Sequence, residues 1–229
     1  MNLIMLDIDG TLTQSYEYDQ EVFSHTISEV TGVPFHDTNW HSYEYITSSG
    51  VTPEAIYRAT GRSATSEQVE AVERTLLWHL EQRHQKSPSD FTEIPGAAAF
   101  ISSLKCFDDV VVSIATGCWH SEAIFKLKAS NINVAGIPMA TCDDSKSREE
   151  IMAISAQRAL TAYQVSHFDR IVYIGDGVWD MKASKSLGYG FIGVGARLQL
   201  LRDRGIDYLH EDYTELSKVL LSIEAVLAG

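Results

Sequence analysis

The chain has 229 residues, of which 45% are hydrophobic and 21% charged, and its formal net charge is -13. These values are ordinary for a globular protein with one large domain or two small ones. Because a strongly acidic surface repels nucleic-acid backbones and anionic lipids, we expect neither nucleic acid nor membrane among the partners. The three cysteines show no paired spacing, and no apolar run resembles a signal peptide or a membrane span, which favours a cytoplasmic location.

The first predicted element is a buried strand over residues 3–8, and an acidic pair, Asp7 and Asp9, stands at its end. Side chains two residues apart on a strand point to the same side, so both carboxylates are expected to face one spot. Burying two like charges together is costly unless a cation or a shared proton compensates them. A plain turn or helix cap is the alternative, because Asp-Gly is a common turn dipeptide.

Residues 16–94 contain no convincing strand and several helix starts. Thr65 and Gln68, for example, form a capping-box pattern ahead of a long helix that is predicted to reach about residue 86. We therefore predict an all-α cap over residues 16–94. Since this insert begins directly after the acidic pair, it can lie over the pair as a lid.

From residue 95 onward, predicted strands and helices alternate, which favours a doubly wound α/β domain. The fold class is therefore predicted as α/β, a Rossmann-like parallel sheet formed by residues 1–15 and 95–229, with the inserted all-α cap domain. Strands are predicted at residues 110–115, 170–175 and 189–194, with a weaker one at 136–141, and helices at 96–107, 120–129, 148–163, 178–187 and 214–227.

Polar groups follow three further predicted strands, at the edge where ligands of an open α/β sheet bind. Thr116 and Gly117 precede a helix and can hold an anion, Lys146 stands just ahead of the next helix, and Asp176 and Asp180 flank a strand-to-helix turn. Taken alone, each has a simpler explanation: an N-cap, an exposed lysine, and acids favoured by a helix dipole. Their coincidence at one edge of one sheet indicates a single site.

These motifs closely resemble the four motifs of the haloacid dehalogenase superfamily, in order and over nearly the whole chain. The helical insert between the first and second motifs is similar to that of members with a small α-helical cap, such as phosphoglycolate phosphatase and β-phosphoglucomutase. The motifs are Asp7-Ile8-Asp9-Gly10-Thr11-Leu12-Thr13, Thr116-Gly117, Lys146 and Gly175-Asp176-Gly177-Val178-Trp179-Asp180.

The resemblance implies phosphoryl transfer through an aspartyl-phosphate, with Asp7 as the nucleophile and Asp9 as the acid and base that moves protons. It also implies Mg²⁺, held by the Asp7 carboxylate, the Asp9 backbone carbonyl and Asp176. The phosphoryl group would be bound by Thr116, Gly117 and Lys146. Asp180 would order a metal-bound water or pair with the lysine.

Within the family, the acid at position 9 favours phosphate chemistry over dehalogenation, because displacing halide needs no leaving-group proton. We expect a Mg²⁺-dependent phosphatase acting on a small phosphorylated metabolite. A phosphomutase or pyrophosphatase of the same fold, or a catalytically idle phosphate-binding protein, stays open as the alternative.

Substrate contacts are predicted in the cap and beside the second motif. The small polar residues Thr47, Ser48 and Ser49 suggest a compact hydrophilic substrate. Arg58 is a candidate for binding a second anionic group, although a solvated helix end is the simpler reading. Trp119 could wall the leaving-group side, although core packing explains it equally well. The sequence indicates no oligomeric state.

Overall fold

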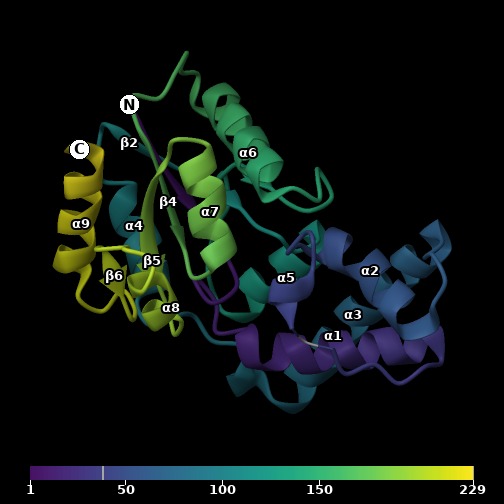
Figure 1. Cartoon of the computed structure of the whole chain (residues 1–229). Coiled ribbons are helices and arrows are strands. Elements are labelled where there is room, and N and C mark those ends of the chain that lie inside the picture. Colours follow the sequence, from purple (N-terminus) through teal and green to yellow (C-terminus); the bar gives the residue numbers. More distant parts are fainter. Residues whose placement is uncertain (38, 229) are drawn as a thin grey trace.

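A six-stranded parallel sheet forms the centre of the computed structural model, which describes residues 1–37 and 39–228 (Figure 1). The order of its strands is β3-β2-β1-β4-β5-β6, and every pairing is parallel. This sheet confirms the predicted fold class. The strands are β1 (Asn2–Leu6), β2 (Val110–Ala115), β3 (Met139–Ala140), β4 (Ile171–Gly175), β5 (Gly190–Val194) and β6 (Leu209–His210).

The strand β1 lies in the middle of the sheet because both of its faces are apolar. Leu3 and Met5 enter one hydrophobic core, whereas Ile4 and Leu6 enter the other, and all four are fully buried. Such uninterrupted apolar runs are typical of parallel strands that are covered on both faces. In register, Leu6 pairs with residue 114 of β2 and residue 174 of β4, so the residues that follow these three strands meet at one edge.

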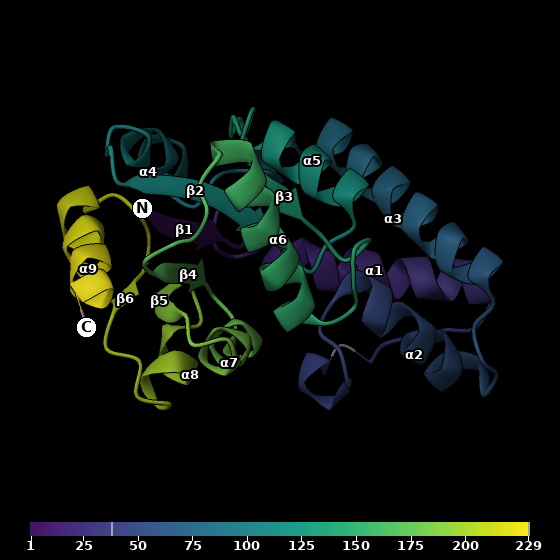
Figure 2. The same ribbon diagram turned by 90° about the horizontal axis from the view of Figure 1, so that it is seen from above.

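Helices cover both faces of the sheet, as Figure 2 shows from above. α6 and α7 pack on one face, and α4 and α9 on the other. The helices outside the predicted cap are α4 (Ala97–Leu104), α5 (His120–Ala129), α6 (Arg148–Tyr163), α7 (Val178–Ser186), α8 (Leu198–Arg202) and α9 (Leu216–Ala228). None of the helices in the described part of the chain is long and apolar enough to cross a membrane.

The remaining helices lie together beside the sheet (Figure 1). These α-helices are α1 (Tyr16–Thr31), α2 (Ser48–Thr60) and α3 (Ser66–Lys86). Helix α1 packs against both α2 and α3. The capping box at the start of α3 forms as predicted, with reciprocal hydrogen bonds between Thr65 and Gln68.

Two chain segments connect these helices to the sheet, and they run side by side. Thr13 bridges to Glu93, the N–H of Gln14 donates to the carbonyl of Thr92 at 2.9 Å, and the N–H of Ile94 donates to the carbonyl of Leu12 at 2.8 Å. The backbone of the two crossings is therefore joined like a short piece of sheet. The division of the chain into an α/β core of residues 1–15 and 95–229 and a cap of residues 16–94 stays a prediction.

Candidate active site

Three buried aspartates meet at the carboxyl edge of the sheet. Asp7 follows β1, Asp176 follows β4, and Asp180 lies in the first turn of α7. One carboxylate oxygen from each lies within 4.8 Å of the others, and each side chain is at most 3% exposed. Asp180 also accepts the N–H of Gly177 at 2.9 Å, which fixes the turn between β4 and α7. We call these three residues the strand-edge acids.

Burial controls the protonation of the strand-edge acids. It raises the pKa of Asp7 to about 7, that of Asp176 to about 7 and that of Asp180 to about 6, and arginines oppose each rise. Arg148 Nη1 lies 2.7 Å from Asp180 Oδ1 and 3.4 Å from Asp7 Oδ1, and Arg197 Nε donates to Asp176 Oδ2 at 3.1 Å. The positive charge of both arginines therefore favours the ionised form of these carboxyl groups.

The donor set of the strand-edge acids suits a hard divalent cation. It consists of carboxylate oxygens, the ligands that Mg²⁺ prefers, and it lacks the sulfur and imidazole donors of softer metals. Like charges packed this closely raise each other's pKa, as Asp180 does for Asp7, so a cation would relieve a real repulsion. The residues present therefore fit the metal that the sequence predicts.

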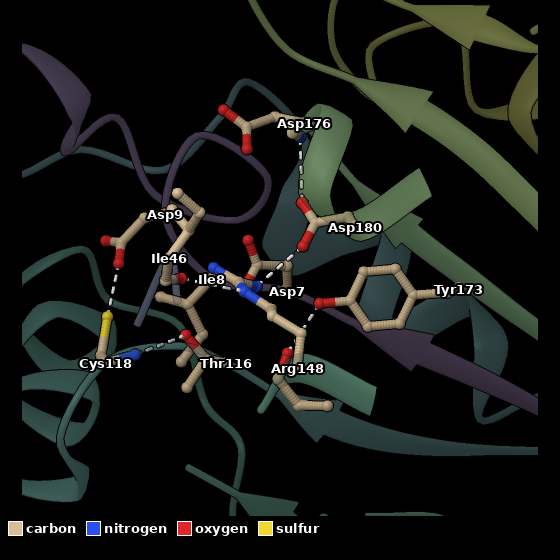
Figure 3. Close-up of polar contacts among 12 residues, drawn as sticks. Asp7, Ile8, Asp9, Ile46, Thr116, Cys118, Arg148, Tyr173, Asp176 and Asp180 are labelled. Carbon is tan, nitrogen blue, oxygen red and sulfur yellow. Dashed lines mark hydrogen bonds and ion pairs between the residues drawn. The ribbon is translucent and has the colours of Figure 1, made fainter. Parts of the chain in front are cut away.

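Asp9 belongs to a second cluster, although it stands two residues from Asp7. Figure 3 shows its carboxylate pointing away from Asp7 and toward Cys118. The ammonium of Lys126, from α5, lies 2.9 Å from Asp9 Oδ1, 2.8 Å from the Asp19 carboxylate and 2.7 Å from Glu122 Oε1. The Lys126 side chain is 1% exposed. We call these four charged residues the lysine cluster.

The lysine cluster gives Asp9 a pKa shift opposite to that of Asp7. Burial raises the pKa of Asp9, but the charge of Lys126 and hydrogen bonds from Cys118 and Ser15 bring it below its ordinary value. The pKa of Asp19, by contrast, is raised to about 8, chiefly by burial. The sequence analysis did not single out Lys126. The available signal was a lysine four residues after Glu122, between the apolar positions Ala123 and Leu127.

Thr116 and Gly117 lie beside the strand-edge acids, where the sequence predicted them. Thr116 is buried, and its hydroxyl oxygen accepts the N–H of Cys118 at 3.4 Å. Gly117 allows Arg148 to approach the backbone closely, because a Cβ at this position would lie 2.7 Å from Nη2 of Arg148. Its carbonyl also accepts the N–H of Ser48 at 2.7 Å, which links β2 to the start of α2.

Lys146, in contrast, is not brought to the strand-edge acids. Its side chain is exposed, and its ammonium lies 4.3 Å from the centre of the Tyr45 ring. The physical reason is its position ahead of Ser147, the N-cap of α6, because the chain there has not yet entered the helix. Arg148, the first residue of α6, reaches Asp7 and Asp180 instead, and its side chain is only 13% exposed. Of these two cations, Arg148 is therefore the one that the structure places beside Asp7 and Asp180.

The predicted substrate residues have different surroundings. Thr47 and Ser48 line a cavity at the sheet edge, whereas the hydroxyl of Ser49 donates to the Cys142 carbonyl at 2.9 Å. Arg58 lies on α2 and forms ion pairs with Asp37 and Glu54. Trp119 is 3% exposed and packs in the hydrophobic core.

Between the sheet edge and the helices of residues 16–86 lies a cavity of about 130 Å³. The strand-edge side contributes Asp7, Asp176, Arg148 and Arg197, and Asp9, Asp19 and Glu122 of the lysine cluster also line it. A small ligand there would meet the buried carboxyl groups of Asp7 and Asp176, the guanidinium groups of Arg148 and Arg197, and the carboxylate of Asp9. Such an arrangement can bind an anion and attack it with a carboxylate.

Solved structures share this architecture. A hydrolase from Pseudomonas syringae is 23% identical, with a TM-score of 0.74 over 97% of this chain and 99% of that one. A putative β-phosphoglucomutase from Bacteroides vulgatus is 18% identical, with a TM-score of 0.70 over 100% of this chain and 91% of that one. CbbY from Rhodobacter sphaeroides, solved with xylulose-(1,5)bisphosphate, is 20% identical, with a TM-score of 0.68 over 93% and 95% of the two chains. At these identities the likeness establishes the fold alone.

The family assignment comes from the sequence. No curated protein matches the chain significantly. The sequence profile of the haloacid dehalogenase-like hydrolases, however, matches residues 4–194, which include both acidic motifs and the intervening helices. The chain therefore belongs to the haloacid dehalogenase-like hydrolase family.

Proposed function

We propose that the protein is a Mg²⁺-dependent phosphatase that hydrolyses the phosphomonoester of a small metabolite through an aspartyl-phosphate on Asp7. The observation that carries this proposal is the position of Asp7 itself. Its carboxylate is buried at the strand edge, faces Asp176 and Asp180, and is approached by the guanidinium of Arg148 at 3.4 Å. A carboxylate in such surroundings is fixed in place and ready to attack a bound phosphate.

The first half of the proposed reaction forms a bond between an Asp7 oxygen and phosphorus and breaks the ester P–O bond. The leaving alkoxide takes a proton from the carboxyl group of Asp9. In the second half, Asp9 as a carboxylate removes a proton from water, which attacks phosphorus and releases inorganic phosphate from Asp7. Atoms balance over the two steps, and both Asp7 and Asp9 return to their starting states.

The phosphate oxygens would be held by Arg148, by the hydroxyl of Thr116 and by the backbone N–H of Gly117. Arg148 takes the role first given to Lys146, since only the arginine of the two reaches Asp7. Mg²⁺, held by Asp7, Asp176 and the Asp9 carbonyl with Asp180 in support, would neutralise charge on the phosphoryl group.

Asp9 is prepared unequally for its two tasks. The lowered pKa that Lys126 and its other partners give it favours the carboxylate, which suits the removal of a proton from water. Donation to the leaving group requires the protonated form, which the same ion pair disfavours. We therefore expect cleavage of the ester, rather than hydrolysis of the aspartyl-phosphate, to be the step that is slowed at high pH.

The test is phosphate release from a panel of monoesters, with Mg²⁺ and with EDTA, by the unmodified protein and by the Asp7→Asn variant. We expect turnover that requires Mg²⁺ and the Asp7 carboxylate. Turnover by Asp7→Asn would contradict the nucleophile assignment. Movement of phosphate to another hydroxyl of the same substrate, without release, would instead indicate the phosphomutase alternative.

A further inference from the structure

The side of the cavity that faces the helices of the predicted cap is largely apolar. Phe23 of α1, Val51 of α2 and Leu76 of α3 line this side, and each residue is at most 6% exposed to solvent. Trp40 and Ile46 complete this wall, and the Trp40 ring packs edge-on against Phe23 at 5.3 Å between centroids. We call these five residues the apolar wall. A leaving group that extends away from Asp7 would lie against them.

The charged groups beside the apolar wall are acidic. Asp19 and Glu122 line the cavity, and their charge is shared with the enclosed ammonium of Lys126. Among the described residues that line the cavity, the cations are Arg148 and Arg197, and each binds a strand-edge acid. A second phosphate or carboxylate that lay against the apolar wall would therefore meet the carboxyl groups of Asp19 and Glu122, whereas the two arginines lie on the strand-edge side of the cavity.

Two arginines of the predicted cap, Arg58 and Arg83, lie outside the cavity and add no positive charge to its lining. Arg58 is bound to Asp37, Glu54 and the Ser42 carbonyl, outside the cavity. Arg83 is bound to Glu21 and Asp90, also outside it. The earlier expectation that Arg58 holds a second anionic group is thus not supported by its position.

Gln20 of α1 lines the cavity with an amide, whereas the small polar residues at the start of α2 are engaged within the protein. Of the small polar residues at the start of α2, Ser49 is turned to the Cys142 carbonyl, and the Ser48 hydroxyl donates to Glu122 at 3.3 Å. The Thr47 hydroxyl donates to the carbonyl of Lys146 at 3.0 Å. Each of these side chains already has a protein partner, so the segment does not present a free polar surface to a sugar.

We infer that the preferred substrate is the phosphate monoester of a small, largely apolar alcohol that carries no second anionic group. This inference rests on the proposed phosphatase function and names its substrate class. Contact with the apolar wall provides binding energy for such an alcohol. The carboxylate of glycolate would lie beside Asp19 and Glu122, and the hydroxyl groups of a sugar would lie against apolar side chains.

The test compares kcat/KM, in the presence of Mg²⁺, for methyl phosphate, benzyl phosphate, 2-phosphoglycolate and glucose 6-phosphate. All are esters of primary alcohols, so differences report mainly on recognition of the leaving group. We expect benzyl phosphate to exceed each of the others by at least about tenfold, the scale of a few matched apolar contacts.

Two variants locate the preference in the apolar wall. Trp40→Ala should lower the ratio of kcat/KM for benzyl phosphate to that for methyl phosphate by about tenfold. Trp78→Ala removes a tryptophan that is 51% exposed on α3 and outside the cavity, and the ratio should not change. If Trp40→Ala does not fold, Ile46→Ser, which alters a half-buried residue of the same wall, should give the same fall in ratio.

The outcomes separate this inference from the function on which it rests. Faster turnover of phosphoglycolate or glucose 6-phosphate than of benzyl phosphate would overturn the inference and leave the phosphatase standing. An unchanged ratio in a folded Trp40→Ala or Ile46→Ser variant would overturn it as well. Absence of turnover for all of the esters, with Mg²⁺ present, would instead overturn the proposed function.

Discussion

The strand-edge acids and the lysine cluster each bring together three carboxyl groups, but cations offset their negative charge in different ways. Arg148 and Arg197 reach the strand-edge acids from the rim, and the pKa values of Asp7 and Asp176 still rise to about 7. Lys126 lies inside its cluster and brings the pKa of Asp9 below its ordinary value, although burial still raises that of Asp19 to about 8. The comparison teaches that the immediate neighbours, and not the spacing of two acids in the sequence, determine their chemistry.

The largest effect should come from the strand-edge acids. Asp7→Asn is expected to lower kcat by about 10⁴-fold or more, because the amide cannot form the covalent intermediate. Phosphate release measures the loss, and circular dichroism should show an intact fold because the substitution removes a buried charge that is repelled by Asp176 and Asp180. Activity within tenfold of the unmodified protein would move the nucleophile away from this cluster.

Lys126→Met tests the internal compensation of the lysine cluster. Removing the ammonium leaves three neighbouring carboxyl groups without their shared counter-ion, and that of Glu122 is only 6% exposed, so unfolding should become easier by about 3–5 kcal/mol. The matched control is Lys128→Met, an exposed lysine on the same helix, whose effect should stay within about 0.5 kcal/mol. Urea denaturation measures both.

A second substitution checks the cause of that destabilisation. Adding Glu122→Gln to Lys126→Met should recover part of the lost stability, because it removes one of the uncompensated acids. Equal urea midpoints for Lys126→Met and Lys128→Met would mean that the buried ammonium is not what stabilises this region.

Arg148 and Lys146 provide the next comparison, because the structure brings only the first to Asp7. Arg148→Met should lower kcat/KM by about 10²–10³-fold, the scale for losing one group that stabilises the transition-state charge. Lys146→Met should change it by less than about threefold, as expected for an exposed side chain outside the site. The reverse ranking would return the phosphate-binding role to the lysine.

The last expected effect is a dependence of stability on pH in the absence of divalent ions. Asp7 and Asp176 have pKa values of about 7 in the folded protein and 3.8 as the ordinary value, so the folded state binds more protons between these limits. Without divalent ions, stability should therefore fall as the pH rises from about 5 to about 8. The lowered pKa of Asp9 acts below this window, so it does not oppose the trend.

Thermal unfolding in EDTA at several pH values measures this dependence, and added Mg²⁺ should raise Tm most at the high end of the range, where the acids are ionised. Asp176→Asn should flatten the curve. A melting temperature that rises from pH 5 to pH 8 in EDTA would show that the strand-edge acids are not held with raised pKa values.

Much of the fold was readable from local patterns. The apolar runs of β1, β2, β4 and β5 and the capping box before α3 gave those elements nearly to the residue. In contrast, β6 and α8 were not predicted, because they have only two and five residues and offer no periodicity to detect. The weak strand predicted at residues 136–141 exists only as the two residues of β3.

The site was predictable only where position along a strand fixes it. Asp7 and Asp176 follow adjacent strands, so parallel topology alone brings them together. The direction of a helix side chain depends on how its helix lies on the sheet, which is why Arg148 was overlooked in favour of Lys146. Lys126 could be noticed from its place between two apolar helix positions, but its partner Asp19 could not, because it is 107 residues away in the sequence.

The paired crossings at Thr13 and Glu93 have a consequence for engineering. Because the chain leaves and re-enters the sheet through neighbouring, hydrogen-bonded segments, we expect that the residues between them can be exchanged as a cassette without altering how the strands connect. A donor cassette must still supply an acid at the position of Asp19. Without it, Lys126 keeps only the carboxylates of Asp9 and Glu122, and we expect the graft to alter the protonation of Asp9.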